Sequence, residues 1–190
     1  MRIAIARAIS IVGHPVVLIS CAGLIAASTH GASPVQMRTI GATLLSLAAI
    51  VVGFTWIQVK AGRWAHVDAS ARTERSSLNV FLATLLLAGA VLVWFLLHNL
   101  HMAVALSLSA ALIVAALLLA RRVKMSLHVA FAAFATSLLW PVTWAAVAGL
   151  LITAAVAWSR LTLGRHVPAD VIVGLLLGAL AGSAYVQWLT

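Results

Sequence analysis

Four residues near the end of the chain have the types and the spacing that phosphoryl chemistry needs. Ser159 and Arg160 are followed after five residues by His166 and after three more by Asp170, just before an apolar run. Hydrolysis of a phosphate ester without a metal needs a nucleophile, an acid for the leaving oxygen, and cations for the phosphoryl oxygens. His166 can attack phosphorus if Asp170, four residues later, holds its other ring nitrogen. Arg160 offers a forked donor to phosphate.

Two further polar clusters precede this one. The first is the most polar stretch of the chain, residues 60–79, and it contains Arg75, a second forked donor. The second contains Ser126 and His128. We expect Ser126 to hydrogen-bond the phosphate or cap the following helix, and His128 to protonate the leaving alkoxide.

The three clusters together resemble the type 2 phosphatidic acid phosphatase superfamily. Residues 159–170 match every fixed position of its S-R-x5-H-x3-D motif. Residues 125–128 keep the Ser and His of the P-S-G-H motif but lack its Pro and Gly. Residues 68–76 keep only the Arg of the K-x6-R-P motif, with Asp in place of Lys and Ser in place of Pro. The resemblance covers about residues 60–190.

The resemblance implies hydrolysis through a phosphohistidine, with no metal or other cofactor. Lys124 is a plausible replacement for the missing motif lysine, and we expect Asp68 and Glu74 to orient Arg72, Arg75 or Lys124. The candidate site then has three groups: catalytic His166, His128 and Asp170; phosphate-binding Arg75, Arg160, Ser126 and Lys124; and supporting Asp68, Glu74, Arg72 and Ser159.

The composition determines what kind of scaffold must position these residues. Of 190 residues, 64% are hydrophobic and 8% are charged, which is too few charges to cover a soluble surface. At about 20 residues per membrane crossing, the chain is predicted to be all-α, a polytopic transmembrane bundle of six to seven helices. We expect one integral membrane domain, residues 1–190, with a motif-bearing core at about 60–190 and two membrane helices in 1–59.

Apolar runs predict helices near residues 9–28, 40–59, 80–97 and 102–120, with a last helix reaching Trp188. Residues 126–158 are apolar but interrupted by Trp140-Pro141. One kinked helix would put the second and third clusters on opposite faces of the membrane, whereas two short helices would bring them to the same face. The residue before proline resists helical geometry, which favours the hairpin. Gly174, Gly178 and Gly182 predict close helix packing in the last helix.

With the hairpin, nearly all of the 12 Lys and Arg residues fall on the face that carries the clusters, whereas Arg38 lies on the other. The positive-inside rule makes the cluster face cytoplasmic, and we expect a bacterial inner-membrane protein. The expected partners are a lipid phosphate substrate and the bilayer, with no nucleic acid. The oligomeric state is not predicted.

The predicted function is hydrolysis of a lipid phosphate or diphosphate, of the polyprenyl phosphate or phosphatidate type. One alternative is a transporter or lipid-binding protein on the same scaffold. Another is a metal hydrolase with His128, His166 and Asp170 as ligands, although the accompanying Arg residues would oppose a cation. The isolated histidines His14, His30, His98 and His101 are interpreted as structural, and His66 stays undecided.

Overall fold

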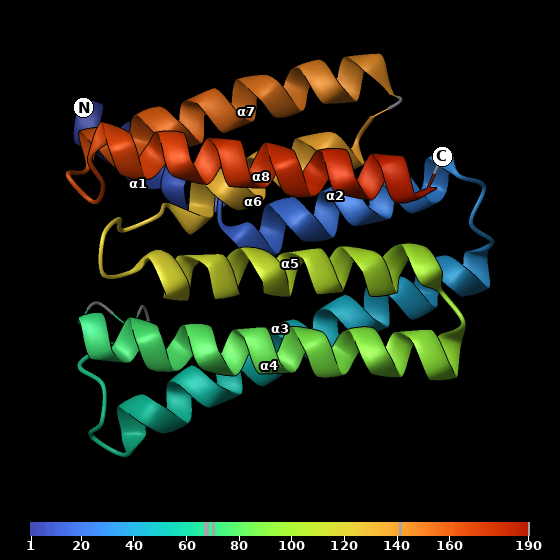
Figure 1. Cartoon of the computed structure of the whole chain (residues 1–190), viewed down its shortest axis with the longest axis horizontal. Coiled ribbons are helices and arrows are strands. Elements are labelled where there is room, and N and C mark those ends of the chain that lie inside the picture. Colours follow the sequence, from blue (N-terminus) through green and yellow to red (C-terminus); the bar gives the residue numbers. More distant parts are fainter. Residues whose placement is uncertain (67–68, 70, 141, 190) are drawn as a thin grey trace. The chain divides into compact units, whose positions relative to one another are not determined.

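The computed structural model describes residues 1–66, 69, 71–140 and 142–189. The described residues form eight helices and confirm the all-α prediction (Figure 1). In chain order they are α1 Arg2–Val12, α2 Pro15–Thr29, α3 Pro34–Lys60, α4 Arg72–Leu97, α5 Leu100–Leu119, α6 Leu127–Leu138, α7 Thr143–Thr162 and α8 Pro168–Leu189.

Within the described residues, five helices are long and apolar enough to cross a bilayer: α3, α4, α5, α7 and α8. The pair α1 and α2, bent by 51°, makes a sixth span if it crosses as one unit. With this pair the described residues contain six candidate spans, which agrees with the lower end of the predicted six to seven. Helix α6 has 12 residues, about 18 Å at 1.5 Å per residue, and is too short for a hydrocarbon core of about 30 Å. The chain is thus an integral membrane protein with one short inner helix.

The predicted first helix, near residues 9–28, is wrong in its extent. The helix starts at Arg2 and breaks at Gly13 and His14, and a second helix begins at Pro15. His14 has extended backbone angles, φ −64° and ψ 136°, because the ring of a following proline disfavours the helical region. Proline then occupies the first turn of α2, where its missing N–H costs no hydrogen bond.

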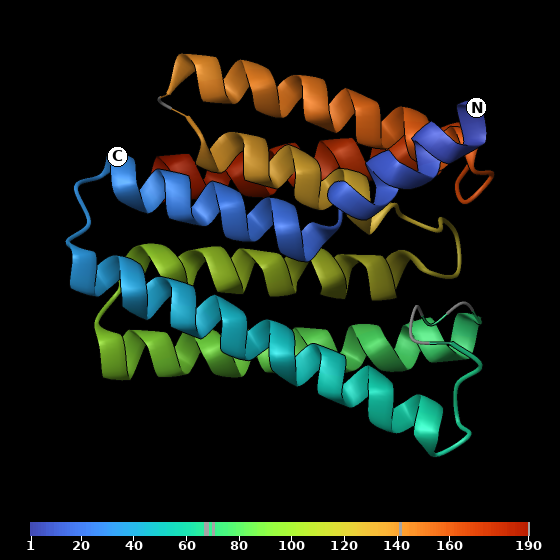
Figure 2. The ribbon, with the colours of Figure 1, turned by 180° about the vertical axis from the view of Figure 1, so that it is seen from behind.

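The predicted hairpin at Trp140-Pro141 is confirmed in the described residues on either side of Pro141, which lies outside them. Helices α6 and α7 run in opposite directions from this turn (Figures 1 and 2). Across the pair, the hydroxyl oxygens of Thr136 and Thr153 are 3.1 Å apart. A Cβ on Gly149 would lie 2.8 Å from the Thr136 hydroxyl, so the glycine permits this approach.

By its contacts the chain divides into two compact units, and each is described by itself. Unit 1 comprises Met1–Met37 and Leu118–Thr190, and unit 2 comprises Arg38–Leu117. The first 37 residues therefore pack with the last third of the chain. The single domain expected from the sequence stays a prediction.

Unit 1 is built around α6. Val129 and Ala132 of this helix, Val156 of α7 and Val171 of α8 form a buried core. Helix α8 packs closely along α6, since a Cβ on Gly174 would lie 2.6 Å from the Ser126 carbonyl oxygen. Gly178 and Gly182 meet Ala130 and Ser137 still more closely. The glycine spacing thus serves packing within the chain, as predicted, and it sets α6 and α8 parallel.

Unit 2 holds most of α3, with α4 and α5. Phe54 of α3 stacks on Phe81 of α4 with ring centroids 3.8 Å apart. Gly89 of α4 faces Leu47 of α3 and Leu106 of α5. Helix α4 begins at Arg72, eight residues before the apolar run that predicted it at Val80, because the polar residues 72–79 continue the same helix.

Candidate active site

Asp170 organises the loop between α7 and α8. Its Oδ2 accepts a hydrogen bond from the Val167 backbone amide at 3.1 Å, and its Oδ1 accepts one from the Lys124 amide at 3.1 Å. The same Oδ2 lies 3.4 Å from Nδ1 of His166. Only 9% of the Asp170 side chain is exposed, so these bonds satisfy a buried carboxylate. One acid therefore joins the second and third sequence clusters.

The hydrogen bonds of His166 determine which ring nitrogen is basic. Its Nδ1 lies 3.0 Å from the backbone carbonyl oxygen of Lys124. A carbonyl oxygen only accepts, so Nδ1 must carry the proton and donate. In the neutral ring the lone pair then lies on Nε2. The sequence predicted the contact with Asp170 but not this carbonyl, which comes from 42 residues earlier.

The surroundings of His166 favour its neutral form. Burial lowers the pKa of His166 below its usual 6.5, and the positive charges of Arg160 and Lys124 lower it further. The bonds to the Lys124 carbonyl and to Asp170 act in the opposite direction but are outweighed. At neutral pH the ring is therefore a free base with a nucleophilic Nε2.

Ser126 is fully buried at the start of α6, and its backbone amide donates to the Asp170 carbonyl at 3.1 Å. Its hydroxyl does not cap the helix, and Oγ has no hydrogen-bond partner among the described residues. Of the two roles expected for Ser126, capping is excluded. A buried hydroxyl without a partner costs free energy unless a ligand satisfies it.

Arg160, near the end of α7, also has an unsatisfied donor. Its Nη1 donates to the Ser10 hydroxyl of α1 at 2.6 Å. Its Nε is buried and has no partner among the described residues. The neighbouring Ser159, by contrast, is satisfied within its own helix, since its Oγ donates to the Val156 carbonyl at 2.8 Å. Ser159 thus supports the helix, whereas Arg160 has a donor left for an anion.

His128 lies in the first turn of α6, two residues after Ser126. Its ring meets that of His14 edge to face, with centroids 5.4 Å apart and an interplanar angle of 85°. The positive charge of Arg160 acts on both rings and on His166, so all three imidazoles lie close enough to one guanidinium to be affected by its charge. Sequence reasoning missed Ser10 and treated His14 as structural, although the His14-Pro15 interruption was a visible signal of a break.

The geometry thus brings together Ser126, His128, Arg160, His166 and Asp170. The chain matches the family model described as the PAP2 superfamily over residues 125–190. This part of the chain is similar to the PAP2 superfamily. The resemblance inferred from the motifs is therefore confirmed for this part of the chain. No match was found among the curated proteins or the solved structures.

Superfamily members are generally phosphoric-ester hydrolases, which agrees with the chemistry of this cluster. The matched residues contain both well-kept and degraded motifs, 159–170 and 125–128, but not Lys124. The Nζ of Lys124 donates to the Arg165 carbonyl at 2.8 Å, so this side chain connects the loop before α6 to the loop before α8. Its expected role as a phosphate donor stays a prediction.

The first sequence cluster lies in unit 2 and outside the PAP2 match. Glu74 is buried and accepts hydrogen bonds from the backbone amides of Ala65 and Ala71, each at 3.0 Å. It therefore holds the loop before α4. Asp68 lies outside the described residues. The roles expected for Arg75 in binding the phosphate and for Arg72 as a supporting residue stay predictions.

The metal-hydrolase alternative would need His128, His166 and Asp170 to converge as ligands. Among the residues that the structure describes, no group of three or more His, Cys, Asp or Glu side chains is placed to hold a metal ion. Both oxygens of Asp170 and the Nδ1 of His166 are already used in hydrogen bonds to the loop.

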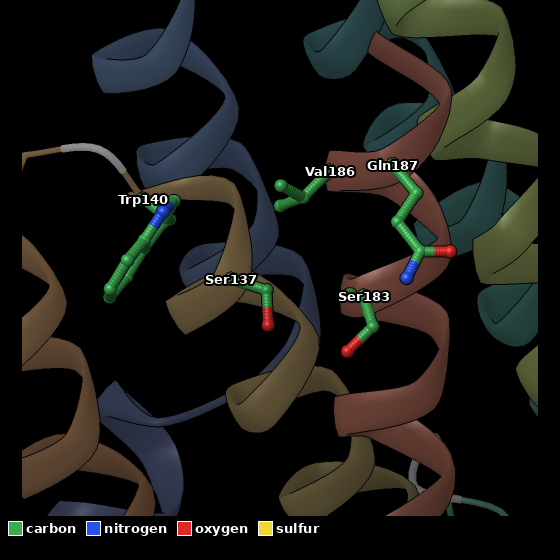
Figure 3. A pocket seen from close by; sticks show the side chains of 6 residues that line it. Ser137, Trp140, Ser183, Val186 and Gln187 are labelled. Carbon is green, nitrogen blue, oxygen red and sulfur yellow. The ribbon is translucent and has the colours of Figure 1, made fainter. Parts of the chain in front are cut away.

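A pocket of about 330 Å³ lies at the opposite end of α6 and α8 (Figure 3). It is lined by Ser137, Trp140, Gly182, Ser183, Val186 and Gln187. Because α6 and α8 run parallel, this pocket is separated from Ser126 and His166 by the length of the short helix. It does not belong to the PAP2 site.

Proposed function

We propose that the protein is a membrane phosphatase that hydrolyses the phosphate monoester or diphosphate of a lipid through a phosphohistidine on His166. The observation that carries the proposal is a pair of buried polar atoms, Ser126 Oγ and Arg160 Nε, that have no hydrogen-bond partner among the described residues and lie in the same cluster as a neutral imidazole. Phosphate oxygens would satisfy both atoms. The PAP2 match supports the reaction class.

In the first step Nε2 of His166 attacks phosphorus, forming a P–N bond as the P–O bond to the lipid breaks. The leaving oxygen takes a proton from His128. Burial and then the charge of Arg160 lower the pKa of this ring to about 3 without substrate, and the charge of a bound phosphate dianion would raise it. Asp170 and the Lys124 carbonyl stabilise the positive charge that develops on the His166 ring, because both accept from Nδ1. Arg160 and Ser126 stabilise the phosphoryl oxygens.

In the second step water attacks the phosphohistidine. His128, now neutral, takes a proton from the water, and the P–N bond breaks as the new P–O bond forms. Inorganic phosphate leaves, His166 returns to its neutral form, and His128 is again protonated. The reaction needs no metal or other cofactor.

The surroundings of the site support a lipid substrate. The loops that carry His166 and Ser126 adjoin apolar helices, so a lipid phosphate would place its head at the loops and its apolar part among the lipids of the bilayer. We propose a polyprenyl phosphate or phosphatidate type of substrate and a cytoplasmic site, supported by the basic residues of the cluster face.

Phosphate release from purified lipid phosphates tests the proposal. We expect the detergent-solubilised protein to release phosphate from phosphatidate or a polyprenyl phosphate in the presence of a chelator, and orthovanadate to inhibit it. Denatured protein should carry acid-labile phosphate when quenched during turnover, and His166→Ala should carry none. A wild-type protein that binds these lipids without releasing phosphate would favour the alternative of a transporter or lipid-binding protein.

Reporter fusions test the orientation. A reporter that is active only outside the cytoplasm should work when fused after Thr190 and stay silent when inserted in residues 60–79. The opposite pattern would place the site on the outer face.

A further inference from the structure

The break between α1 and α2 reaches the site from a part of the chain that the PAP2 match does not cover. We call residues 10–14 the N-terminal elbow; it contains Ser10, Gly13 and His14. The elbow contacts two candidate phosphate-handling side chains, Arg160 and His128. Both contacts join residues more than 100 positions apart.

The contact of Ser10 is specific to one edge of the Arg160 guanidinium. The Ser10 hydroxyl accepts from Nη1 at 2.6 Å, which is short for a hydrogen bond to a charged donor. A bond at Nη1 leaves the edge formed by Nε and Nη2 for another acceptor, and Nε is buried without a partner in the part of the chain that the structure describes. An arginine edge of this kind binds two oxygens of a phosphate. Ser10 thus holds the guanidinium with its binding edge available.

The contact of His14 orients the imidazole ring of His128. Nδ1 of His14 accepts from the Val16 backbone amide at 3.3 Å, so in the neutral ring the proton lies on Nε2. This bond caps α2 and holds the imidazole in place. The ring then meets His128 edge to face at 5.4 Å and restricts the plane of that imidazole.

The elbow is held rigidly against α7. Gly13 is buried, and a Cβ at this position would lie 2.5 Å from Cγ2 of Val156 and 2.8 Å from the Ile9 carbonyl oxygen. On either side, Ile9 and Leu18 pack against the core of unit 1. A side chain at residue 13 would push the elbow away from Arg160. The chain therefore has a glycine where α1 must pass close to α7.

We propose that the N-terminal elbow is part of the catalytic site, with Ser10 a positioning residue for Arg160 and His14 a positioning residue for His128. The proposal rests on the proposed phosphatase function. It assigns the first 37 residues a role in catalysis beyond membrane anchoring.

Ser10→Ala tests the first contact. We expect kcat/KM for lipid phosphate hydrolysis and the affinity for orthovanadate each to fall about tenfold, since a hydrogen bond to a charged group is lost. Ser10→Thr keeps the hydroxyl and should restore both. The matched control is Ser28→Ala in α2, whose hydroxyl bonds only the Ile25 carbonyl of its own helix, and it should match the wild type. In an Arg160→Lys background, Ser10→Ala should add little.

His14→Asn tests the second contact, because Asn also caps helices and α2 should remain intact. The loss of rate should be large for an alkyl lipid phosphate, whose leaving group needs a proton, and small for p-nitrophenyl phosphate, whose leaving group does not. His30→Asn, at the other end of α2, is the control. Equal losses with both substrates would reduce His14 to a structural residue.

The orthovanadate measurement separates the two proposals. If the wild type binds orthovanadate but hydrolyses no lipid phosphate, the proposed function fails while the role of Ser10 is still decided by binding. If Ser10→Ala binds and turns over like the wild type, the elbow proposal is wrong and the phosphatase stands. A wild type that does neither overturns both.

Discussion

The loops before α8 and before α4 are both held by an acidic residue that caps the following helix, but the two loops differ in the side chains near that acid. In each, an acid in the first turn of the helix reaches back three residues to a backbone amide, Asp170 to Val167 and Glu74 to Ala71. Each acid also accepts from a second backbone amide: Glu74 from that of Ala65 in its own loop, and Asp170 from that of Lys124 in the loop before α6. Asp170 also has an imidazole beside it, since Nδ1 of His166 lies 3.4 Å from its Oδ2. An acid that caps the following helix therefore orders the loop before it. A histidine four residues before the acid, as in the loop before α8, adds a group that can react.

The largest expected effect is that of His166→Ala, which removes the nucleophile from the first loop and leaves its capping intact. We expect turnover to fall by about 10⁴-fold or more, since groups that act as a unit lose most of their effect together. The thermal unfolding midpoint should stay close to that of the wild type. Retained turnover would show that His166 is not the nucleophile.

Asp170→Asn and Glu74→Gln form a matched pair that tests the comparison directly. Both replace a buried carboxylate with an amide and weaken two bonds to backbone amides, so both should lower the unfolding midpoint. Only Asp170→Asn should lower kcat strongly, on the order of 10³-fold, because it also disturbs the orientation of His166. Equal losses of kcat in steady-state assays would mean that both loops serve catalysis.

Ser126→Ala should separate activity from stability. Oγ of Ser126 has no hydrogen-bond partner among the described residues, so its removal should leave the unfolding midpoint unchanged or higher. The rate should fall about 10²-fold if the hydroxyl donates to the phosphoryl group. A fall in the unfolding midpoint without a change in rate would contradict this role.

The smallest expected effect is on the pH profile. Because burial and two positive charges lower the pKa of His166, the neutral nucleophile persists below pH 6.5. The acid limb of kcat/KM should therefore lie below that value, with the rate lost as pH falls through the lowered pKa. Lys124→Gln removes one of these charges and should move the limb to higher pH. A limb unmoved or displaced to lower pH would contradict this account.

The sequence predicted those parts of the fold and site that depend on short-range spacing. The break at Trp140-Pro141 and the pairing of His166 with Asp170 both follow from residues within one or two helical turns. The break at His14-Pro15 has the same cause, but the continuous apolar run around it concealed the second helix. The sequence predicts the start of α4 at Val80 instead of Arg72, because residues 72–79 are polar and polarity alone does not distinguish a loop from the end of a helix.

The remaining contacts could not be predicted because they depend on how distant segments pack. Ser10 meets Arg160 across 150 positions, and the Lys124 carbonyl meets His166 across 42. Neither Ser10 nor a backbone carbonyl has a sequence pattern that indicates catalysis. The Ser126 amide likewise donates to the carbonyl of Asp170, which belongs to a distant segment.

The bond between His166 and the Lys124 carbonyl has a consequence for mutational robustness. Every amino acid supplies the same carbonyl, so no substitution at residue 124 removes this acceptor as long as the chain follows the same path. The tautomer of His166 is thus determined by the path of the main chain at residue 124. Evolution can vary the charge at residue 124, and with it the working pH, without disturbing the atom that reacts.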